Sequence, residues 1–396
     1  MVFSSSVKCI TYTTPLTHKC ICWHLFTDII IMMTRTVRYA LPYDKALVDT
    51  VSAGVNVFRF WSDIAYEHQT SNKFRLHHLG YYVARELFPS FGSMLILTVR
   101  DTVAEARKAI HTRTGDKNPK VKAHKGRGLR YNDHCFTMKK DGTVSISTVK
   151  GRKKYKIAPA PGYEDWSCNS ATLKLSKGRI FLHCQYKKEA PPVKKWKPSD
   201  VLGVDRGIKN IIACSDNTIM NSKKLRNIKG RYQHVKSTLQ SKGTRSAKRR
   251  LNAMSGREER FVMDVNHCIS KHLIGSRFGV FVLEELKNIK KNSVKGKLAK
   301  KTRKLIGGWS FRQFQTFLEY KAEAVGKVVV YVDPKHTSRR CSCCGHTEKA
   351  NRKGRSFRCV KCNFSLNADL NASRNIAGLG ISVSCRADSQ APLCSS

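Results

Sequence analysis

The stretch PKHTSRRCSCCGHTEKANRKGRSFRCVKCNFSLNADLNASRNIA, residues 334–377, holds two cysteine pairs, Cys341 with Cys344 and Cys359 with Cys362. Two residues separate the members of each pair, and 14 residues lie between the pairs. This spacing is typical of a zinc ribbon, in which two short knuckles bring four thiolates together as a tetrahedron. We therefore predict that these four cysteines bind Zn²⁺. Because four thiolates leave no open coordination position, this zinc would stabilise the fold and take no part in catalysis.

The first pair leaves one alternative ligand open. Cys343 places a fifth thiol inside the first knuckle, but Cys341 and Cys344 give the two-residue spacing and leave Gly345 for the turn. After the second pair stands Asn363, where such a knuckle usually has glycine. Asparagine tolerates the left-handed backbone conformation, so this difference is compatible with the same turn.

The charge of the chain indicates a polyanionic partner. Its 396 residues include 74 Lys and Arg against 28 Asp and Glu, a net charge of +46. Such a chain repels itself when compact, and nucleic acid is the first candidate partner because counterion release drives the association. An anionic membrane is disfavoured, since the sequence shows no long apolar span and no amphipathic basic helix. The hydrophobic content of 41% excludes a wholly disordered chain.

Cysteine usage predicts a reducing compartment. The 15 cysteines are an odd number in a long chain, which argues against a secreted disulfide scaffold. Four have metal spacing, and scattered ones such as Cys184, Cys214 and Cys268 lie in apolar contexts typical of buried thiols. We therefore predict a cytoplasmic protein, intracellular and associated with the nucleoid.

The first residues do not read as a secretory signal. Residues 1–32 contain an apolar run, but His24 and Asp28 interrupt it and no cleavage site of small residues follows. We interpret this segment as an extension, disordered or produced by a misplaced start, with the functional chain beginning at Met32 or Met33.

The N-terminal part changes its periodicity twice. Residues 34–43 alternate as a strand, residues from about 45 to 110 carry apolar positions at three- and four-residue intervals, and between about 122 and 188 the period shifts to two. We therefore predict a β-barrel or sandwich domain over residues 33–189, with a helical insertion at about 45–120.

A proline-bearing linker, residues 190–200, ends this domain. Beyond it, apolar strands alternate with helices, which predicts an α/β domain around a mixed sheet over residues 201–380. The cysteine ribbon would be inserted at about 337–366. The tail, residues 381–396, shows no periodicity and is expected to be loose.

A basic segment follows the first strands of the second domain. From Lys223 to Lys304 the sequence holds 24 Lys and Arg against 5 Asp and Glu, largely on segments that read as long helices. A charged run is usually a solvated face, but this excess is larger than solubility requires. We predict that the segment contacts phosphates, with Arg249, Arg250 and Lys271 as candidate residues.

Three acidic residues stand where an apolar strand or the ribbon ends: Asp205 in VLGVDRG, Glu284 in VFVLEEL and Asp369 in NADLNAS. Carboxylates at the ends of strands of one sheet can converge although they lie far apart in sequence. In a chain with so few acids, a converged set needs cations. Two Mg²⁺ or Mn²⁺ ions ~4 Å apart would satisfy the carboxylates and clamp a scissile phosphate. We predict that these three residues are catalytic and bind magnesium.

Taken singly, each acid could instead be a turn or cap residue. The three together, beside a zinc ribbon in a strongly basic chain, favour the catalytic interpretation. Glu285 could replace Glu284 as a ligand, but Glu284 directly continues the alternation of its strand.

These motifs and their order resemble the nuclease half of the OrfB/TnpB family of insertion-sequence proteins, which is related to the compact type V CRISPR effectors. The resemblance spans roughly residues 201–378, and it is carried by GVDRGIKNIIACSDN, by VFVLEELKNI, by GWSFRQFQTFLEYKAEAVGKVVVYVDPKHTSRRCSCCG and by FRCVKCNFSLNADLNASRNIA. A weaker resemblance covers residues 34–188, where strand, helical insertion and β-barrel follow the order of the family's wedge and recognition domains.

The resemblance implies an α/β fold: an RNase H-like RuvC nuclease domain with an inserted zinc ribbon, preceded by a β-barrel with a helical insertion. It implies a transposon-associated, RNA-guided DNA endonuclease, often labelled a transposase, whose RuvC site uses Asp205, Glu284 and Asp369 with Mg²⁺. Its partners would be target DNA and a guide RNA from the transposon end. Two alternatives stay open: a transposase that transfers DNA strands itself, and a catalytically silent nucleic-acid-binding regulator.

Overall fold

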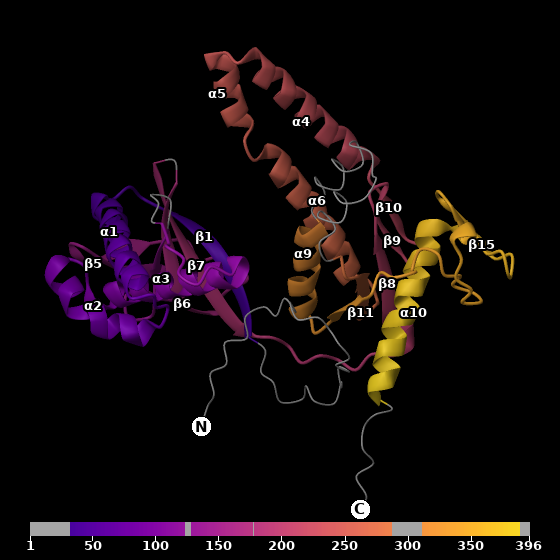
Figure 1. The fold of residues 1–396 in the computed structure, drawn as a ribbon, viewed down its shortest axis with the longest axis horizontal. Coiled ribbons are helices and arrows are strands. Elements are labelled where there is room, and N and C mark those ends of the chain that lie inside the picture. The colour runs from indigo at the N-terminus through magenta and orange to yellow at the C-terminus, as the bar shows by residue number, and fades with distance from the viewer. Residues whose placement is uncertain (1–31, 123–127, 177, 287–310, 389–396) are drawn as a thin grey trace, which may run out of the picture. The chain divides into compact units, whose positions relative to one another are not determined.

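The computed structural model of the chain describes residues 32–122, 128–176, 178–286 and 311–388 (Figure 1). The chain divides after Glu189 into two compact units, each of which is described by itself. The sequence predictions for the N-terminal extension, for the basic residues 287–310 and for the end of the tail lie outside the described residues.

Three helices of the N-terminal unit carry the predicted helical periodicity, which is confirmed: α1 (Lys45–Glu67), α2 (Lys73–Leu87) and α3 (Ser93–Thr114). Their ends follow ordinary capping chemistry. The Asp44 carboxylate accepts a hydrogen bond from the Ala46 N–H at 2.8 Å, Asn72 caps α2, and Gly115 ends α3 in the left-handed conformation.

Two antiparallel sheets complete this unit. A four-stranded sheet has the order β1-β7-β6-β2, and a three-stranded sheet has the order β3-β4-β5. Their strands are β1 (Met32–Leu41), β2 (Leu129–Tyr131), β3 (Phe136–Met138), β4 (Thr143–Thr148), β5 (Gly151–Lys156), β6 (Ser167–Ser176) and β7 (Arg179–Glu189). The first strand pairs along its whole length with β7, from Met32 opposite Glu189 to Leu41 opposite Ile180.

The predicted β-barrel is wrong for the described residues, because neither sheet closes on itself. Strands β2 and β3 have only three residues each, and a turn at Asn132 separates them, so the ladder ends there. One hydrophobic core, which includes Trp61, Tyr131 and Phe136, contains residues of both sheets and of α1 and α3. A two-residue period of apolar residues indicates a strand in a sheet with one buried face, and it is the same in an open sheet and in a closed barrel.

The C-terminal unit is built around a five-stranded mixed sheet of order β10-β9-β8-β11-β12. Its strands are β8 (Val201–Arg206), β9 (Asn210–Cys214), β10 (Ile219–Asn221), β11 (Val280–Glu284) and β12 (Val328–Val332). Strand β11 runs parallel to both β8 and β12, whereas β9 is antiparallel to β8 and to β10. The mixed α/β architecture predicted from the sequence is therefore confirmed.

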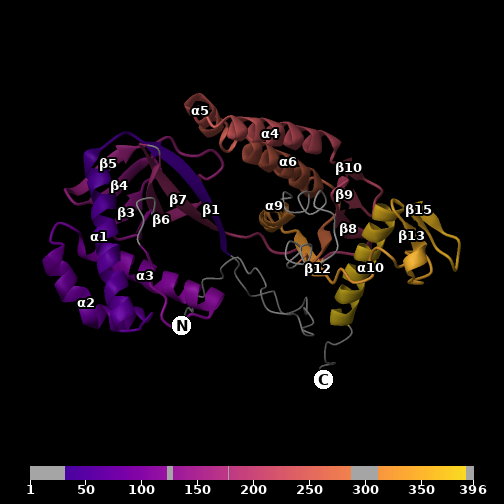
Figure 2. The same ribbon diagram turned by 45° about the horizontal axis from the view of Figure 1, so that its top comes forward.

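Helices cover both faces of this sheet: α6 (Arg257–Ile274), α9 (Phe311–Glu323) and α10 (Ala368–Asp388). Helix α4 (Lys223–Lys242) adds Leu225 to the core, and α5 (Arg245–Met254) packs on α4. On one face, Phe281 and Leu283 of β11 pack with residues of α6 and α9. On the other face, Val280 and Val282 pack against α10, which lies beside β8 in Figures 1 and 2. Strand β11 is thus buried on both sides, which explains its continuous run of apolar residues.

Helix α10 corrects one prediction. It extends to Asp388, so the loose tail predicted from residue 381 is wrong for residues 381–388.

A second correction concerns the scattered cysteines. Cys184 and Cys214 are buried as predicted, but Cys268 on α6 is exposed.

The ribbon between β12 and α10 contains a small three-stranded sheet of order β13-β14-β15. Its strands are β13 (Arg352–Lys353), β14 (Ser356–Arg358) and β15 (Ser365–Asn367). Short 3₁₀ turns occur at Pro198–Asp200 and at Lys349–Asn351.

The contact between α10 and β8 is close enough to admit only glycine at residue 203. A Cβ atom on Gly203 would lie 2.0 Å from the Ser373 carbonyl oxygen and 2.5 Å from the Ala377 nitrogen. We predict that Gly203→Ala lowers the free energy of unfolding by about 3 kcal/mol, because backbone atoms of α10 must move. Chemical denaturation measures this. As a control, Gly378→Ala on the same helix adds a methyl to open space and should leave stability unchanged or raise it. Equal stability of the two variants would contradict the prediction.

Candidate functional site

The structure places Asp205 and Glu284 side by side at the carboxyl ends of two neighbouring strands. Strands β8 and β11 are parallel, and Val204 pairs with Leu283 immediately before the two acids. Both acidic side chains are half-buried. Their nearness follows from the register of a parallel pair, in which strands of equal direction end at the same edge of the sheet.

The third acid reaches the same edge from another element. Asp369 lies in the first turn of α10, and its backbone N–H donates to the Asn367 side chain at 2.9 Å. The charges of Glu284 and Asp369 both act on the Asp205 carboxyl. The structure therefore brings together the three acids that the sequence singled out.

The electrostatics of this cluster are unfavourable without additional positive charge. Burial, followed by the neighbouring charges of Glu284 and Asp369, raises the pKa of Asp205 to about 7, although Arg352 and Arg206 oppose this rise. Burial also raises the pKa of Glu284, against the hydrogen bond from Thr337. The oxygens of the three carboxylates do not form a set lying within 4.8 Å of one another among the described residues.

Two polar side chains hold Asp369, one at each oxygen. Arg352 from β13 contacts Oδ1 at 3.2 Å through Nη2, and Asn210 from β9 donates to Oδ2 at 2.9 Å. The Thr337 hydroxyl donates to Oε1 of Glu284. Sequence reasoning missed these three residues. Nothing in their spacing marks them, because each meets its carboxylate only through the tertiary fold.

Arg206 reinforces the same edge from within the core. It follows Asp205 on β8, is only 7% exposed, and donates through Nη2 to the backbone carbonyl of Glu284. Its other two nitrogens, Nε and Nη1, have no hydrogen-bond partner in the part of the chain that the structure describes. Burial lowers the pKa of this guanidinium, so it is a desolvated cation next to the carboxylate cluster.

The choice between Glu284 and Glu285 is informed by geometry. Glu284 is the last residue of β11, and its charge acts on Asp205. The next residue, Glu285, donates its backbone N–H to the Val332 carbonyl at 2.8 Å and so extends the pairing with β12. Of the two, Glu284 is therefore the one that joins the carboxylate cluster.

The four ribbon cysteines form a compact set. The Sγ atoms of Cys341 and Cys362 lie 3.7 Å apart, those of Cys344 and Cys359 lie 3.6 Å apart, and all four lie within 4.8 Å of one another. Tetrahedral Zn²⁺ with bonds of ~2.3 Å requires sulfur separations of about 3.8 Å, so these side chains fit structural zinc. Burial acts to raise the pKa of Cys359, but backbone N–H groups of Cys362 and Lys361 and nearby thiols lower it to about 6.

The knuckle turns also match the sequence interpretation. Gly345 has φ 75° and Asn363 has φ 55°, so both adopt the left-handed conformation after their cysteine pairs. Cys343 is exposed and does not belong to the four-sulfur set. The alternative ligand in the first knuckle is therefore not used in this structure.

The candidate phosphate-binding residues lie on exposed helix surface. Arg249 and Arg250 are on α5, and Lys271 is on α6. Helices α4 and α5 form a hairpin whose residues, from Lys223 to Met254, include eleven Lys and Arg and no acid. This acid-free hairpin extends from the sheet in Figure 1, and none of the three clustered carboxylates belongs to it.

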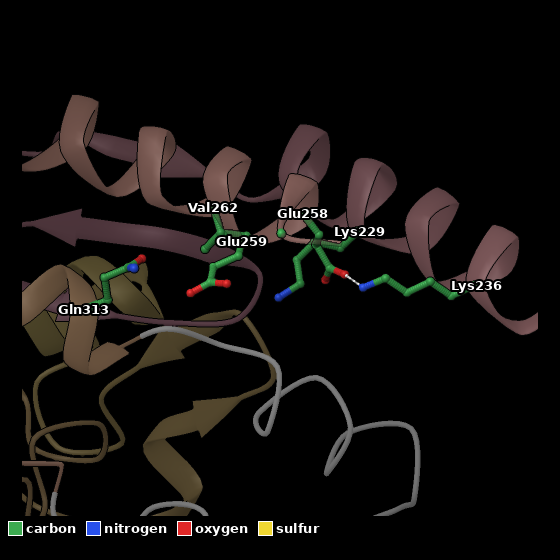
Figure 3. A pocket seen from close by; sticks show the side chains of 7 residues that line it. Lys229, Lys236, Glu258, Glu259, Val262 and Gln313 are labelled. Atoms are coloured by element: carbon green, nitrogen blue, oxygen red, sulfur yellow. Dashed lines mark hydrogen bonds and ion pairs between the residues drawn. The ribbon is translucent and has the colours of Figure 1, made fainter. Parts of the chain in front are cut away.

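A pocket of about 340 Å³ lies between α4, α6 and α9, lined by Lys229, Lys236, Gly256, Glu258, Glu259, Val262 and Gln313 (Figure 3). Lys236 Nζ contacts Glu258 at 2.6 Å. Two lysines face two glutamates, so the lining carries no net charge. It does not favour a phosphate, and none of the three clustered carboxylates lines it.

Comparison with known proteins finds matches to two regions of the C-terminal unit. The model described as "Probable transposase" matches residues 183–290, and the model described as "Cas12f1-like, TNB domain" matches residues 311–376. "TnpB-like protein MJ0751" of Methanocaldococcus jannaschii is 38% identical over 125 residues, which are 31% of this chain and 44% of that protein. Over these regions the chain is similar to the OrfB/TnpB family. Both matched regions carry residues of the carboxylate cluster, and the second contains the four cysteines.

Further proteins to which this chain is similar are named as nucleases. "Putative RNA-guided DNA endonuclease InsQ" of Escherichia coli K12 is 29% identical over 237 residues, 54% of this chain and 57% of that protein. "CRISPR-associated endodeoxyribonuclease Cas12f1" of Sulfoacidibacillus thermotolerans is 34% identical over 117 residues, 28% of this chain and 26% of that protein. These matches span between about a quarter and three fifths of the relatives' lengths.

A solved structure shares the fold. The chain is similar to the protein of the "Cryo-EM structure of the Cas12f1-sgRNA-target DNA complex", with a TM-score of 0.57 and 15% identity over 87% of this chain and 99% of that chain. In the part of the chain that the structure describes, no helix has the length and apolar character needed to cross a membrane.

For the ribbon, we predict that Cys359→Ser lowers the bound zinc well below one ion per chain and destabilises the C-terminal unit by several kcal/mol, because zinc binding is coupled to folding. Metal analysis of the purified protein and thermal unfolding measure this. Cys343→Ser is the matched control and should retain zinc. A Cys359→Ser protein with full zinc content and unchanged unfolding would refute the assignment.

For the carboxylate cluster, we predict that Asp205→Asn stabilises the chain in the absence of added divalent cations. The folded-state pKa of Asp205 is about 7, above its ordinary value, so its ionisation destabilises the fold progressively from about pH 4 to about pH 7. At pH 8 the variant should gain on the order of 2 kcal/mol, and the gain should vanish towards pH 4. Denaturation curves across this pH range test it. A gain that does not depend on pH would argue against the electrostatic cause.

Proposed function

We propose that this chain is an RNA-guided DNA endonuclease encoded by a transposon, which hydrolyses phosphodiester bonds at a RuvC-like site. The observation that carries the proposal is the convergence of Asp205, Glu284 and Asp369 at one edge of the sheet. Parallel strands β8, β11 and β12 with helices on both faces support an RNase H-like fold for this unit.

The carboxylate cluster fits a divalent cation such as Mg²⁺ or Mn²⁺. Its ligand atoms are hard carboxylate oxygens. The pKa of Asp205 is raised by burial and then by the charges of Glu284 and Asp369, and a bound cation would oppose both effects. Asp205, Glu284 and Asp369 would hold the metal. When bound, two such ions activate a water molecule as nucleophile and stabilise the leaving 3′ oxygen.

The chain's own residues prepare this site. Asn210 and Arg352 hold the two oxygens of Asp369, so this carboxylate is oriented before substrate binds. The Arg352 guanidinium also brings a positive charge beside the cluster, where it would stabilise the negative charge that gathers on the phosphate oxygens.

The acid-free hairpin would supply affinity for the nucleic-acid backbone. Its exposed cations, Arg249 and Arg250 among them, neutralise phosphates without reading sequence. Sequence would be read by pairing between a guide RNA from the transposon end and the target strand. The names of InsQ and of Cas12f1, and the sgRNA and target DNA in the solved Cas12f1 complex, support these partners.

The N-terminal unit, residues 32–189, would act as the wedge and recognition domains of the enzyme, with residues 190–200 as the linker to the nuclease domain. Because the proposed substrate is DNA, the protein would work in the cytoplasm at the nucleoid.

One experiment separates the proposed function from its alternatives. The protein is purified together with RNA co-expressed from the transposon end, the RNA is sequenced, and a plasmid library with random flanking sequence is offered with Mg²⁺. RNA-directed breaks are expected. Joined DNA strands would instead indicate a strand-transferring transposase, and binding without breaks would indicate a regulator.

We predict that Asp205→Ala lowers cleavage by about a thousandfold or more, because the cluster loses a metal ligand. RNA binding should be unchanged, since the proposed backbone contacts lie elsewhere. Asp264→Ala, which removes an exposed acid from α6, is the control and should cleave normally. Normal cleavage by the Asp205 variant would disprove the two-metal site.

A further inference from the structure

Thr337 contacts the candidate metal ligand Glu284 from the start of the ribbon. Its side chain is buried, at 3% exposure, and its hydroxyl donates to Oε1 of Glu284. The same oxygen atom of Thr337 lies 3.0 Å from the Pro334 carbonyl. A hydroxyl has one proton, and an ionised carboxylate is the stronger acceptor, so the proton goes to Glu284. Among the described residues, the structure records no other hydrogen bond to this carboxylate.

Thr337 is itself held in place by α10. Asn375 donates to the Thr337 carbonyl at 2.9 Å and to the Arg340 carbonyl at 2.6 Å, and Asn371 donates to the Arg340 carbonyl at 2.8 Å. The two asparagines are buried and lie four residues apart, so they share one face of the helix. The segment from Thr337 to Arg340 is therefore fixed against α10.

The same helix carries Asp369 in its first turn. Asn371 also accepts a hydrogen bond from the Ser342 N–H at 3.0 Å, next to the first zinc ligand, Cys341. Glu284 and Asp369 belong to different elements, yet both are positioned relative to α10: Asp369 directly, and Glu284 through Thr337.

We propose that Thr337 is a positioning residue for the divalent cation, an inference that rests on the proposed function. Its hydroxyl fixes Oε1 of Glu284 and so orients the carboxylate that would hold the metal. Hydrogen-bond partners of metal ligands orient them, and losing such a partner typically weakens metal affinity by ten- to a hundredfold. Thr337 does not touch the reacting atoms, so its effect is exerted through Glu284.

The test compares two substitutions in the full-length chain. Thr337→Val keeps the shape and removes the hydroxyl, whereas Thr337→Ser keeps the hydroxyl. Mn²⁺ affinity is measured by electron paramagnetic resonance titration of the zinc-loaded protein, and the Mg²⁺ dependence of cleavage is measured with the RNA-bound protein. Thr337→Val should weaken Mn²⁺ binding and raise the Mg²⁺ requirement by about tenfold or more. Thr337→Ser should keep Mn²⁺ affinity and the Mg²⁺ requirement close to those of the wild-type chain. In both variants the zinc content and the melting temperature should change little.

Three results would overturn the inference: wild-type Mn²⁺ affinity in Thr337→Val, a loss in Thr337→Ser as large as in Thr337→Val, or a loss that occurs only together with release of zinc. Thr347→Val, which removes a hydroxyl elsewhere in the ribbon, is the control and should bind Mn²⁺ normally. A wild-type chain that binds Mn²⁺ through Asp205 but cuts no DNA would contradict the proposed function alone, because the compared Mn²⁺ affinities would still decide the role of Thr337.

Discussion

The close packing of α10 on the backbone of β8 is the contact on which the candidate site depends. At Gly203 the two elements approach so closely that no side chain fits between them. This contact brings the first turn of α10 to the end of β8, and therefore Asp369 to Asp205. The same helix holds the ribbon through Asn371 and Asn375. A single helix thus connects the sheet, the carboxylate cluster and the cysteine set.

The distribution of charge determines which kind of ligand this edge of the sheet favours. In a chain of net charge +46, three of the few acids are gathered at one half-buried edge of a sheet. The fold tolerates them because Arg352, Arg206, Asn210 and Thr337 each contact one of the acidic residues. Arg352 and Arg206 lower the pKa of Asp205, but burial and the charges of Glu284 and Asp369 outweigh them and hold it at about 7. An edge with this character favours a cation over any apolar ligand.

The sequence was sufficient to predict features whose residues lie close together along the chain. The cysteine spacing and the acids after apolar strands lie within short windows, so the four sulfurs and the three carboxylates could be named before their geometry was known. Thr337, Asn210 and Arg352 could not, because their partners are more than 15 residues away and only the tertiary fold brings them together. The predicted β-barrel was wrong for a related reason: the alternation of apolar and polar residues along a strand does not indicate whether the sheet closes on itself.

The end of α10 shows the same limit in another form. The residues after Gly380 lack helical periodicity, yet the helix continues to Asp388. Up to Gly380 the helix is packed on β11, since a Cβ at Gly380 would lie 2.4 Å from the Val282 side chain.

The acid-free hairpin implies that dissolved salt acts on this protein in two opposite ways. Leu225 and Ala247 are the only buried residues of helices α4 and α5, so little apolar packing offsets the repulsion among their eleven cations. Raising the ionic strength screens that repulsion and favours the compact, nucleic-acid-free chain. The same change weakens attachment to a polyanion, because less entropy is gained when counterions are released. The free protein is therefore most stable at a higher ionic strength than the one at which it binds nucleic acid most tightly.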